Sequence, residues 1–157
     1  MLTHIDHVGI AVADLDAAIA QYTAIFGLRL VAVETNPEQG VREAMLALDA
    51  PAPHAPVPHV RDAALPDAAV PASYVQLLEP LAADTPVGRF LARRGPGLHH
   101  VGYAVGDIAA ALESLTAQGV QLVDSRPRHG SLGASIAFVH PHDLFGVLTE
   151  LVQAARA

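Results

Sequence analysis

Hydrophobic and polar positions repeat the same pattern at two places along the chain. Residues 5–15 match residues 98–108, and the match aligns His7 with His100 at a spacing of 93 residues. In each copy, alternating apolar and polar residues predict a strand, and apolar residues along one face predict a helix directly after it. Self-similarity of this kind indicates a duplicated structural unit.

The two predicted helices also begin and end at the same residue types, aspartate at the start and glycine at the end. Asp14 and Asp107 stand at the N-cap positions, where an aspartate side chain accepts a hydrogen bond from a free backbone amide. Gly27 and Gly119 stand where a helix would end in a left-handed residue. Strands are predicted directly after the helices, at 28–35 and 120–124.

A second match closes each copy, since Val75-Gln76-Leu77-Leu78 resembles Thr149-Glu150-Leu151-Val152. The spacing of this match is 19 residues shorter than that of the first, so the first copy carries extra residues. The excess lies at 50–72, a run of alanine and proline that holds six of the chain's twelve prolines. Because proline cannot extend a ladder of backbone hydrogen bonds, we predict an exposed or partly disordered hairpin loop there.

The repeat predicts the organisation of the whole chain. We predict one α+β domain at 1–157, made of a first βαβββ module at 3–80, a linker at 81–97 and a second βαβββ module at 98–153. In the linker, Thr85 can cap a short helix that begins at Pro86 and ends near Arg94. Two such modules can pair their curved sheets into a half-open barrel, in which equivalent strands line one cleft.

Composition narrows the range of functions. A formal charge of −7 with only nine Lys and Arg argues against a nucleic-acid partner. The absence of cysteine excludes disulfides and thiolate metal ligands. The sequence has no run of about 18 apolar residues that would predict a membrane span, and its first residues lack the pattern of a secretory signal. We expect a cytoplasmic protein with a small-molecule partner.

The two matches relate four polar residues in pairs, His7 with His100 and Gln76 with Glu150. Each lies on an otherwise apolar or small-residue face of its strand, which normally turns inward. Taken singly, each would more often be a hydrogen-bonded core or surface residue, but their symmetric recurrence favours a common site. Burying such groups is costly unless they are paired or bind a metal. Two nitrogen and two oxygen donors suit Co²⁺, Mn²⁺, Fe²⁺, Ni²⁺ or Zn²⁺.

Glu43 is a further candidate, on a strand where it shares a face with Val41 and Met45. Desolvation on that face would raise the pKa of its carboxyl group and suit it to taking a proton from carbon. For this residue alone, an exposed glutamate on an edge strand is at least as good an interpretation.

Other polar residues give weaker signals. His54 and His59 fall in the alanine- and proline-rich run, and the remaining histidines have no symmetric partner. Arg89, Arg93 and Arg94 form a basic patch on or just after the linker helix. Such a patch could contact phosphate groups, but a solvated helix face is the better interpretation, and the spacing does not decide between the two.

Five motifs carry a family resemblance. They are Ile5-Asp6-His7-Val8, Asn36-Pro37-Glu38-Gln39-Gly40-Val41-Arg42-Glu43, Val75-Gln76-Leu77-Leu78-Glu79-Pro80, Gly97-Leu98-His99-His100-Val101 and Gly146-Val147-Leu148-Thr149-Glu150-Leu151. With them the chain, except for 50–72, resembles the vicinal oxygen chelate superfamily of glyoxalases and bleomycin resistance proteins. Paired ligands occur across that superfamily, but the segment that leads into Glu43 is typical of its methylmalonyl-CoA epimerases.

The resemblance implies a reaction and a site. One divalent ion, Co²⁺ in the first place, would be bound by His7, Gln76, His100 and Glu150, and Glu43 would be one acid/base residue. The metal would chelate the thioester and carboxylate oxygens of methylmalonyl-CoA while the C2 proton is removed to give an enolate and returned on the opposite face. For the second acid/base the family suggests Glu150, although a cation-bound carboxylate is a weaker base. A homodimer is implied as well.

Departures from the family pattern leave the acyl preference open. The insertion at 50–72 is longer than the family's, and His142-Asp143-Leu144-Phe145 replaces a lysine-containing stretch before Gly146. That replacement is compatible with a larger acyl group such as ethylmalonyl.

Three alternatives remain on the sequence alone. A glyoxalase I-like lyase or isomerase uses a similar site but would place a glutamate where Gln76 stands. A ring-cleaving dioxygenase binds Fe²⁺ with two histidines and one carboxylate and is usually longer. A metal-free module that sequesters an antibiotic would have no need of the paired ligands or of Glu43.

Overall fold

A computed structural model describes residues 1–48 and 73–155. The predicted insertion at 50–72, with His54 and His59, lies outside these residues. The strands are β1 (Leu2–Ala11), β2 (Arg29–Asn36), β3 (Val41–Leu48), β4 (Ser73–Pro80), β5 (Gly97–Val105), β6 (Arg128–His129), β7 (Ser135–Val139) and β8 (Thr149–Gln153). The helices are α1 (Leu15–Phe26), α2 (Pro86–Arg94) and α3 (Ile108–Ala117), with 3-10 turns η1 (Ser131–Gly133) and η2 (Pro141–Leu144).

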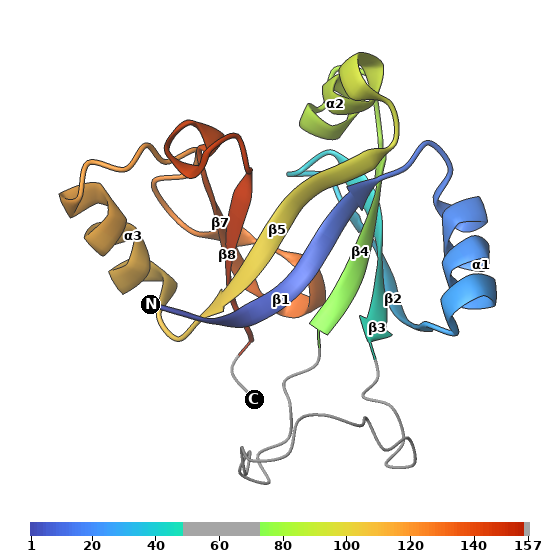
Figure 1. Ribbon diagram of the computed structural model, residues 1–157, viewed down its shortest axis with the longest axis horizontal. Coiled ribbons are helices and arrows are strands. Elements are labelled where there is room, and N and C mark those ends of the chain that lie inside the picture. Colours follow the sequence, from blue (N-terminus) through green and yellow to red (C-terminus); the bar gives the residue numbers. More distant parts are fainter. Residues whose placement is uncertain (49–72, 156–157) are drawn as a thin grey trace, which may run out of the picture.

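The strands form a single curved sheet in the order β2-β3-β4-β1-β5-β8-β7-β6. At its centre β1 and β5 run antiparallel side by side, and each is parallel to its other neighbour, β4 or β8. The order on one side of this central pair mirrors the order on the other. The predicted α+β class and half-open barrel are therefore confirmed, and the centre of the sheet is where the two halves meet (Figure 1).

Hydrophobic clusters attach the helices α1 and α3 to the outer face of the sheet, at opposite ends of the molecule (Figure 1). Leu15 of α1 packs with Leu46 and Leu77, while Ile108 of α3 packs with Leu151. The apolar faces of both helices are thus used on the outside. The inner face remains available for polar groups and a cleft.

The helix caps that the sequence predicts are present in the structure. Asp14 and Asp107 cap α1 and α3 by accepting from the amides of Ala17 and Ala110, both at 2.9 Å. Gly27 ends α1 with a left-handed φ of 68°. In the linker, the hydroxyl of Thr85 accepts from an amide of α2, which begins at Pro86 and ends at Arg94 as predicted.

The predicted strand at 120–124 is wrong. Within this stretch only Leu122 makes a bridge, to Val139. The next two amides, of Val123 and Asp124, both donate to the carbonyl of Phe138, at 2.9 and 3.1 Å. Since two successive amides share one acceptor, the backbone curls and cannot continue a ladder. The edge strand forms further along instead, as β6.

Candidate metal centre and active site

Five buried polar side chains meet on the inner face of the sheet. His7 comes from β1, Glu43 from β3, Gln76 from β4, His100 from β5 and Glu150 from β8. Each is at most 4% exposed to solvent. The structure thus brings together all the residues that the sequence singled out as candidate ligands or as a candidate base.

Three candidate ligand atoms converge closely. His7 Nε2 lies 2.9 Å from His100 Nε2 and 2.9 Å from Glu150 Oε2, and His100 Nε2 lies 3.6 Å from the same oxygen. Two imidazole nitrogens can approach in this way only if a proton or a cation lies between their lone pairs. The three residues could hold a metal ion, since their ligand atoms all lie within 4.8 Å of one another.

Two oxygens of the candidate ligands lack a hydrogen-bond partner among the described residues. They are Glu150 Oε2, whose approach to His7 is too poorly directed for a hydrogen bond, and Gln76 Oε1. The amide nitrogen of Gln76 is already used, because it donates to Glu43 Oε2 at 2.8 Å and to Ser131 Oγ at 2.9 Å. Unpaired buried oxygens are costly, and a divalent ion bound by two nitrogens and these two oxygens would satisfy them. The residues present therefore fit the implied metal.

Two β-bulges place a second residue behind each histidine. In the pairing of β1 with β5, Asp6 is an extra residue on one strand and His99 an extra residue on the other. Both therefore turn toward the neighbouring imidazole. Asp6 Oδ1 lies 2.8 Å from His7 Nδ1, and His99 Nδ1 lies 2.9 Å from His100 Nδ1. Bulges commonly redirect side chains in this way next to functional sites.

These contacts fix which nitrogen of each histidine faces the centre. An acceptor at Nδ1 holds the proton on that atom and leaves Nε2 free to bind a metal. For His7 the acceptor is the Asp6 carboxylate. For His100, the Nδ1 atom contacts the ring of His99, whose pKa is lowered to about 4 by burial and by the neighbouring His100, so that this ring is neutral.

The centre is electrostatically coupled. Burial alone would lower the pKa of His7, but its hydrogen bond with Asp6 and its ion pair with Glu150 outweigh burial and raise it to about 9. Burial alone would likewise raise the pKa of Glu150, but its contacts with His100 and His7 lower it to about 2. Glu150 is therefore held as a carboxylate, the form that binds a cation.

Glu43 has a different environment. Its pKa is raised, first by burial and also by repulsion from Glu150 and Glu34, against a hydrogen bond from Ser131 that lowers it. Glu43 Oε2 accepts from Gln76, while Glu43 Oε1 is buried without a partner among the described residues. A buried carboxylate with one free oxygen is suited to accepting a proton.

The central strands approach closely because two glycines face the two histidines. Gly102 is paired with His7, and Gly9 with His100. A Cβ atom at Gly102 would lie 2.4 Å from the His7 ring, and one at Gly9 would lie 2.2 Å from the His100 ring. Only glycine leaves room for the rings at these two positions, which the sequence repeat relates to each other.

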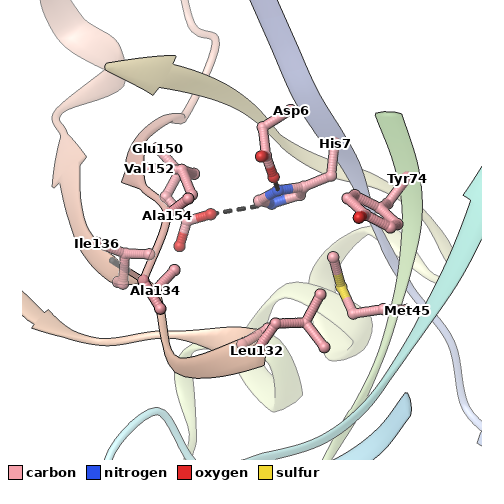
Figure 2. Close-up of a pocket in the computed structure, with 12 residues that line it drawn as sticks. Asp6, His7, Met45, Tyr74, Leu132, Ala134, Ile136, Glu150, Val152 and Ala154 are labelled. Carbon is pink, nitrogen blue, oxygen red and sulfur yellow. Dashed lines mark hydrogen bonds and ion pairs between the residues drawn. The ribbon is translucent and has the colours of Figure 1, made fainter. Parts of the chain in front are cut away.

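A cavity of about 120 Å³ adjoins the centre. His7 and Glu150 form part of its wall, and Asp6 and Glu150 each contact the His7 ring (Figure 2). Tyr74, Met45 and Leu132 are among the other residues that line it (Figure 2). This largely apolar space is suited to a small acyl group next to the candidate metal.

Comparison with known proteins identifies the family. The sequence profile of the Glyoxalase/Bleomycin resistance protein/Dioxygenase superfamily matches residues 6–138. An ethylmalonyl-CoA/methylmalonyl-CoA epimerase of Cereibacter sphaeroides is 33% identical over 155 residues, which cover 98% of this chain and 99% of that protein. The chain belongs to this superfamily and, within it, to the methylmalonyl-CoA epimerase family.

Solved structures agree with this assignment. The chain is similar to a methylmalonyl-CoA epimerase in complex with methylmalonyl-CoA and NH4+, with a TM-score of 0.83 and 42% identity over 99% of this chain and 96% of that one. It is also similar to Streptomyces coelicolor methylmalonyl-CoA epimerase (E43Q) in complex with 2-nitronate-propionyl-CoA, with a TM-score of 0.84 and 42% identity over 99% and 100% of the two chains.

Sequence reasoning missed three residues of the site, namely Asp6, His99 and Ser131. Strict alternation along a strand places a residue next to an inward histidine on the outer face, so it predicted no role for Asp6 or His99. Their equivalence in the repeat was the available signal. Ser131 lies in the turn η1, beyond the repeat matches, and no sequence signal indicated it.

Substituting Gly102 tests the close approach of the two strands. In Gly102→Ala, the added methyl group displaces the His7 ring, and we expect the affinity for Co²⁺ to fall at least about tenfold. Calorimetric titration of the metal-free protein measures this. Gly106→Ala is the matched control, because nothing lies within 4 Å of a Cβ there. Equal Co²⁺ affinity in the two variants, both folded by circular dichroism, would contradict the account.

Proposed function

We propose that this protein interconverts the epimers of methylmalonyl-CoA, or of a close homologue such as ethylmalonyl-CoA, by removing and returning the C2 proton. The carrying observation is the buried Glu43 carboxylate, with its unpartnered oxygen, beside a convergent set of nitrogen and oxygen donors. Membership of the methylmalonyl-CoA epimerase family supports the same reaction.

We propose that His7, Gln76, His100 and Glu150 hold one divalent ion. Nitrogen and oxygen donors in equal number suit Co²⁺, Mn²⁺, Zn²⁺, Ni²⁺ or Fe²⁺, of which we propose Co²⁺. Such an ion, when bound, supplies Lewis-acid stabilisation of the negative charge that develops on the thioester oxygen. Asp6 and His99 would orient the two imidazoles for this role, since each contacts an Nδ1 atom.

In this proposal Glu43 takes the C2 proton. Its Oε2 atom is held by the amide of Gln76 at 2.8 Å, so its Oε1 atom is the one that would face the proton. Its raised pKa makes the carboxylate a stronger base than an exposed glutamate. The product of this step is the enolate of the thioester, and the abstracted proton stays on Glu43 until it passes to solvent.

Inversion requires a second proton carrier on the opposite face of the enolate. Glu150 is the other carboxylate of the centre. It lies on β8, and the central pair β1 and β5 separates this strand from β3, which carries Glu43. Its pKa of about 2 makes it a weak base and favours ligation over proton transfer. We therefore propose that Glu150 is first of all a metal ligand. Its role as the second proton carrier is the weaker part of the proposal.

The alternatives are less well supported by the residues of the centre. A glyoxalase I-like site would carry a glutamate at the position of Gln76. A metal-free binding module would gain nothing from burying two unpaired oxygens and a strong base.

The oligomeric state and the location of the protein are also part of the proposal. We propose a homodimer on family resemblance, and a cytoplasmic location because a chain without cysteine fits a reducing compartment. No described helix is long and apolar enough to cross a membrane.

Removing the proposed base separates catalysis from chelation. In Glu43→Gln the side chain keeps its shape but cannot take a proton, so we expect kcat for epimerisation to fall by roughly a hundredfold or more. Bound cobalt per chain stays at the wild-type value. Glu113→Gln is the control, on the exposed face of α3. Wild-type turnover by Glu43→Gln would rule out this role for Glu43.

The pH profile tests the environment of Glu43. Because the pKa of Glu43 is raised above its ordinary value of 4.5, the base is lost at a higher pH than for an exposed glutamate. Activity should therefore fall as the pH drops through this raised pKa. Ser131→Ala removes a contact that lowers this pKa and should move the acidic limb of kcat/KM to higher pH. An unmoved or lowered limb would contradict the assignment.

A further inference from the structure

Side-chain hydrogen bonds join the two outermost strands of the sheet. β2 and β6 stand at opposite ends of the strand order, and each pairs by its backbone with a single described strand, β3 or β7. The side-chain amides of Asn36 and Gln39 both donate to the backbone carbonyl of His129, each at 3.3 Å. Glu34 Oε2 accepts from the backbone amide of Leu132, also at 3.3 Å. We call these three contacts the clasp, because they link the first module to the second.

Asn36 is a firmly held part of the clasp. Its side chain is buried at the end of β2, and its Oδ1 atom accepts from the backbone amide of Gln39 at 3.1 Å. Its backbone carbonyl accepts from the amide of Gly40, which has a left-handed φ of 71° in the turn before β3. Because Oδ1 faces an N–H group, the Nδ2 group is the one that faces the carbonyl of His129. The turn therefore fixes the orientation of the Asn36 amide.

The turn η1, which the clasp contacts, has little apolar support. None of its three residues is buried, so packing against the core does not fix its position. Leu132 within it has a left-handed φ of 55°, which a leucine adopts only where its surroundings impose it. The bond from Glu34 is made to the amide of this same residue. We therefore attribute the placement of η1 to the hydrogen bonds between the two edges of the sheet.

The same turn carries a contact of the proposed base. Ser131 Oγ accepts from the side-chain amide of Gln76 at 2.9 Å, and its hydroxyl donates to the carboxylate of Glu43. Glu43 and Gln76 belong to the first module, whereas Ser131 belongs to the second. A shift of η1 would therefore separate Ser131 from Glu43 without moving the strands that carry the proposed metal ligands.

We propose that Asn36, supported by Gln39 and Glu34, is a positioning residue that holds Ser131 against Glu43. The inference rests on the proposed function, in which Glu43 takes the C2 proton. Ser131 keeps the Glu43 carboxylate in the orientation from which it meets the substrate, and correct orientation of a reacting group lowers the barrier. Asn36 itself touches neither substrate nor metal and acts only through Ser131. The turn after β2 thereby contributes to the reaction from outside the centre.

A double-mutant cycle tests whether Asn36 acts through Ser131. Asn36→Asp keeps the acceptor for the Gln39 amide but replaces the donor to His129 by a carboxylate oxygen, which repels the carbonyl. We expect kcat, measured above the acidic limb, to fall at least about fivefold in Asn36→Asp and in Ser131→Ala, with bound cobalt unchanged. The double variant should have the kcat of Ser131→Ala within about twofold, because both changes break the same contact. The control Gln21→Glu, at an exposed amide of α1, leaves kcat unchanged.

A second variant serves if Asn36→Asp does not fold by circular dichroism. Gln39→Ala, at a less buried position, removes the other donor to the His129 carbonyl and should lower kcat at least about twofold, but only where Ser131 is present. Two results would overturn the proposal. One is wild-type kcat in folded Asn36→Asp, or in Gln39→Ala where it replaces that variant. The other is a double variant whose loss of kcat is the product of the two single losses, since Asn36 would then act independently of Ser131.

Hydrogen exchange separates this proposal from the proposed function, because it requires no turnover. The backbone amide of Leu132 is bonded to Glu34 across the clasp. We expect this amide to exchange at least about tenfold faster in Asn36→Asp but not in Gln21→Glu. If this holds while the wild-type protein shows no epimerisation, the clasp is supported and the reaction is wrong. If epimerisation is detected while the exchange rate is unchanged, the clasp is wrong and the reaction stands.

Discussion

The central constraint on this protein is a buried cluster of imidazole nitrogens and a carboxylate oxygen whose lone pairs point at one another. Two imidazole nitrogens lie 2.9 Å apart, and a carboxylate oxygen lies at the same distance from one of them. Such a cluster is costly to bury unless a cation or a proton lies within it. The apolar packing of α1 and α3 on the outer face supports the sheet that holds these groups in place. The stability of the fold and the burial of the polar site therefore depend on each other.

The two modules contribute equivalent residues to this buried cluster. His7 and His100 occupy equivalent places on the two central strands, each faces a glycine across the pair, and each has a bulged residue behind its Nδ1 atom. The equivalence is structural but not chemical. Behind His7 stands a carboxylate, Asp6, and behind His100 stands a neutral imidazole, His99. This difference makes the two halves of the centre electrostatically unequal.

The sequence predicted the architecture well because periodicity and capping are local signals. The caps at Asp14, Asp107 and Thr85 formed as predicted, and the repeat brought equivalent strands to the centre of one sheet. The strand at 120–124 failed because its amides share one carbonyl acceptor, which no local pattern reveals. The bulges and the turn of Ser131 escaped prediction for a similar reason, since they depend on how distant strands pair.

The most direct test of the central claim is deuterium incorporation at C2 of methylmalonyl-CoA in D₂O, followed by mass spectrometry with cobalt-loaded and chelator-stripped protein side by side. The account predicts rapid exchange and interconversion of the two epimers by the loaded protein, and exchange close to the spontaneous rate after stripping. Exchange no faster than the spontaneous rate in the cobalt-loaded protein would contradict it.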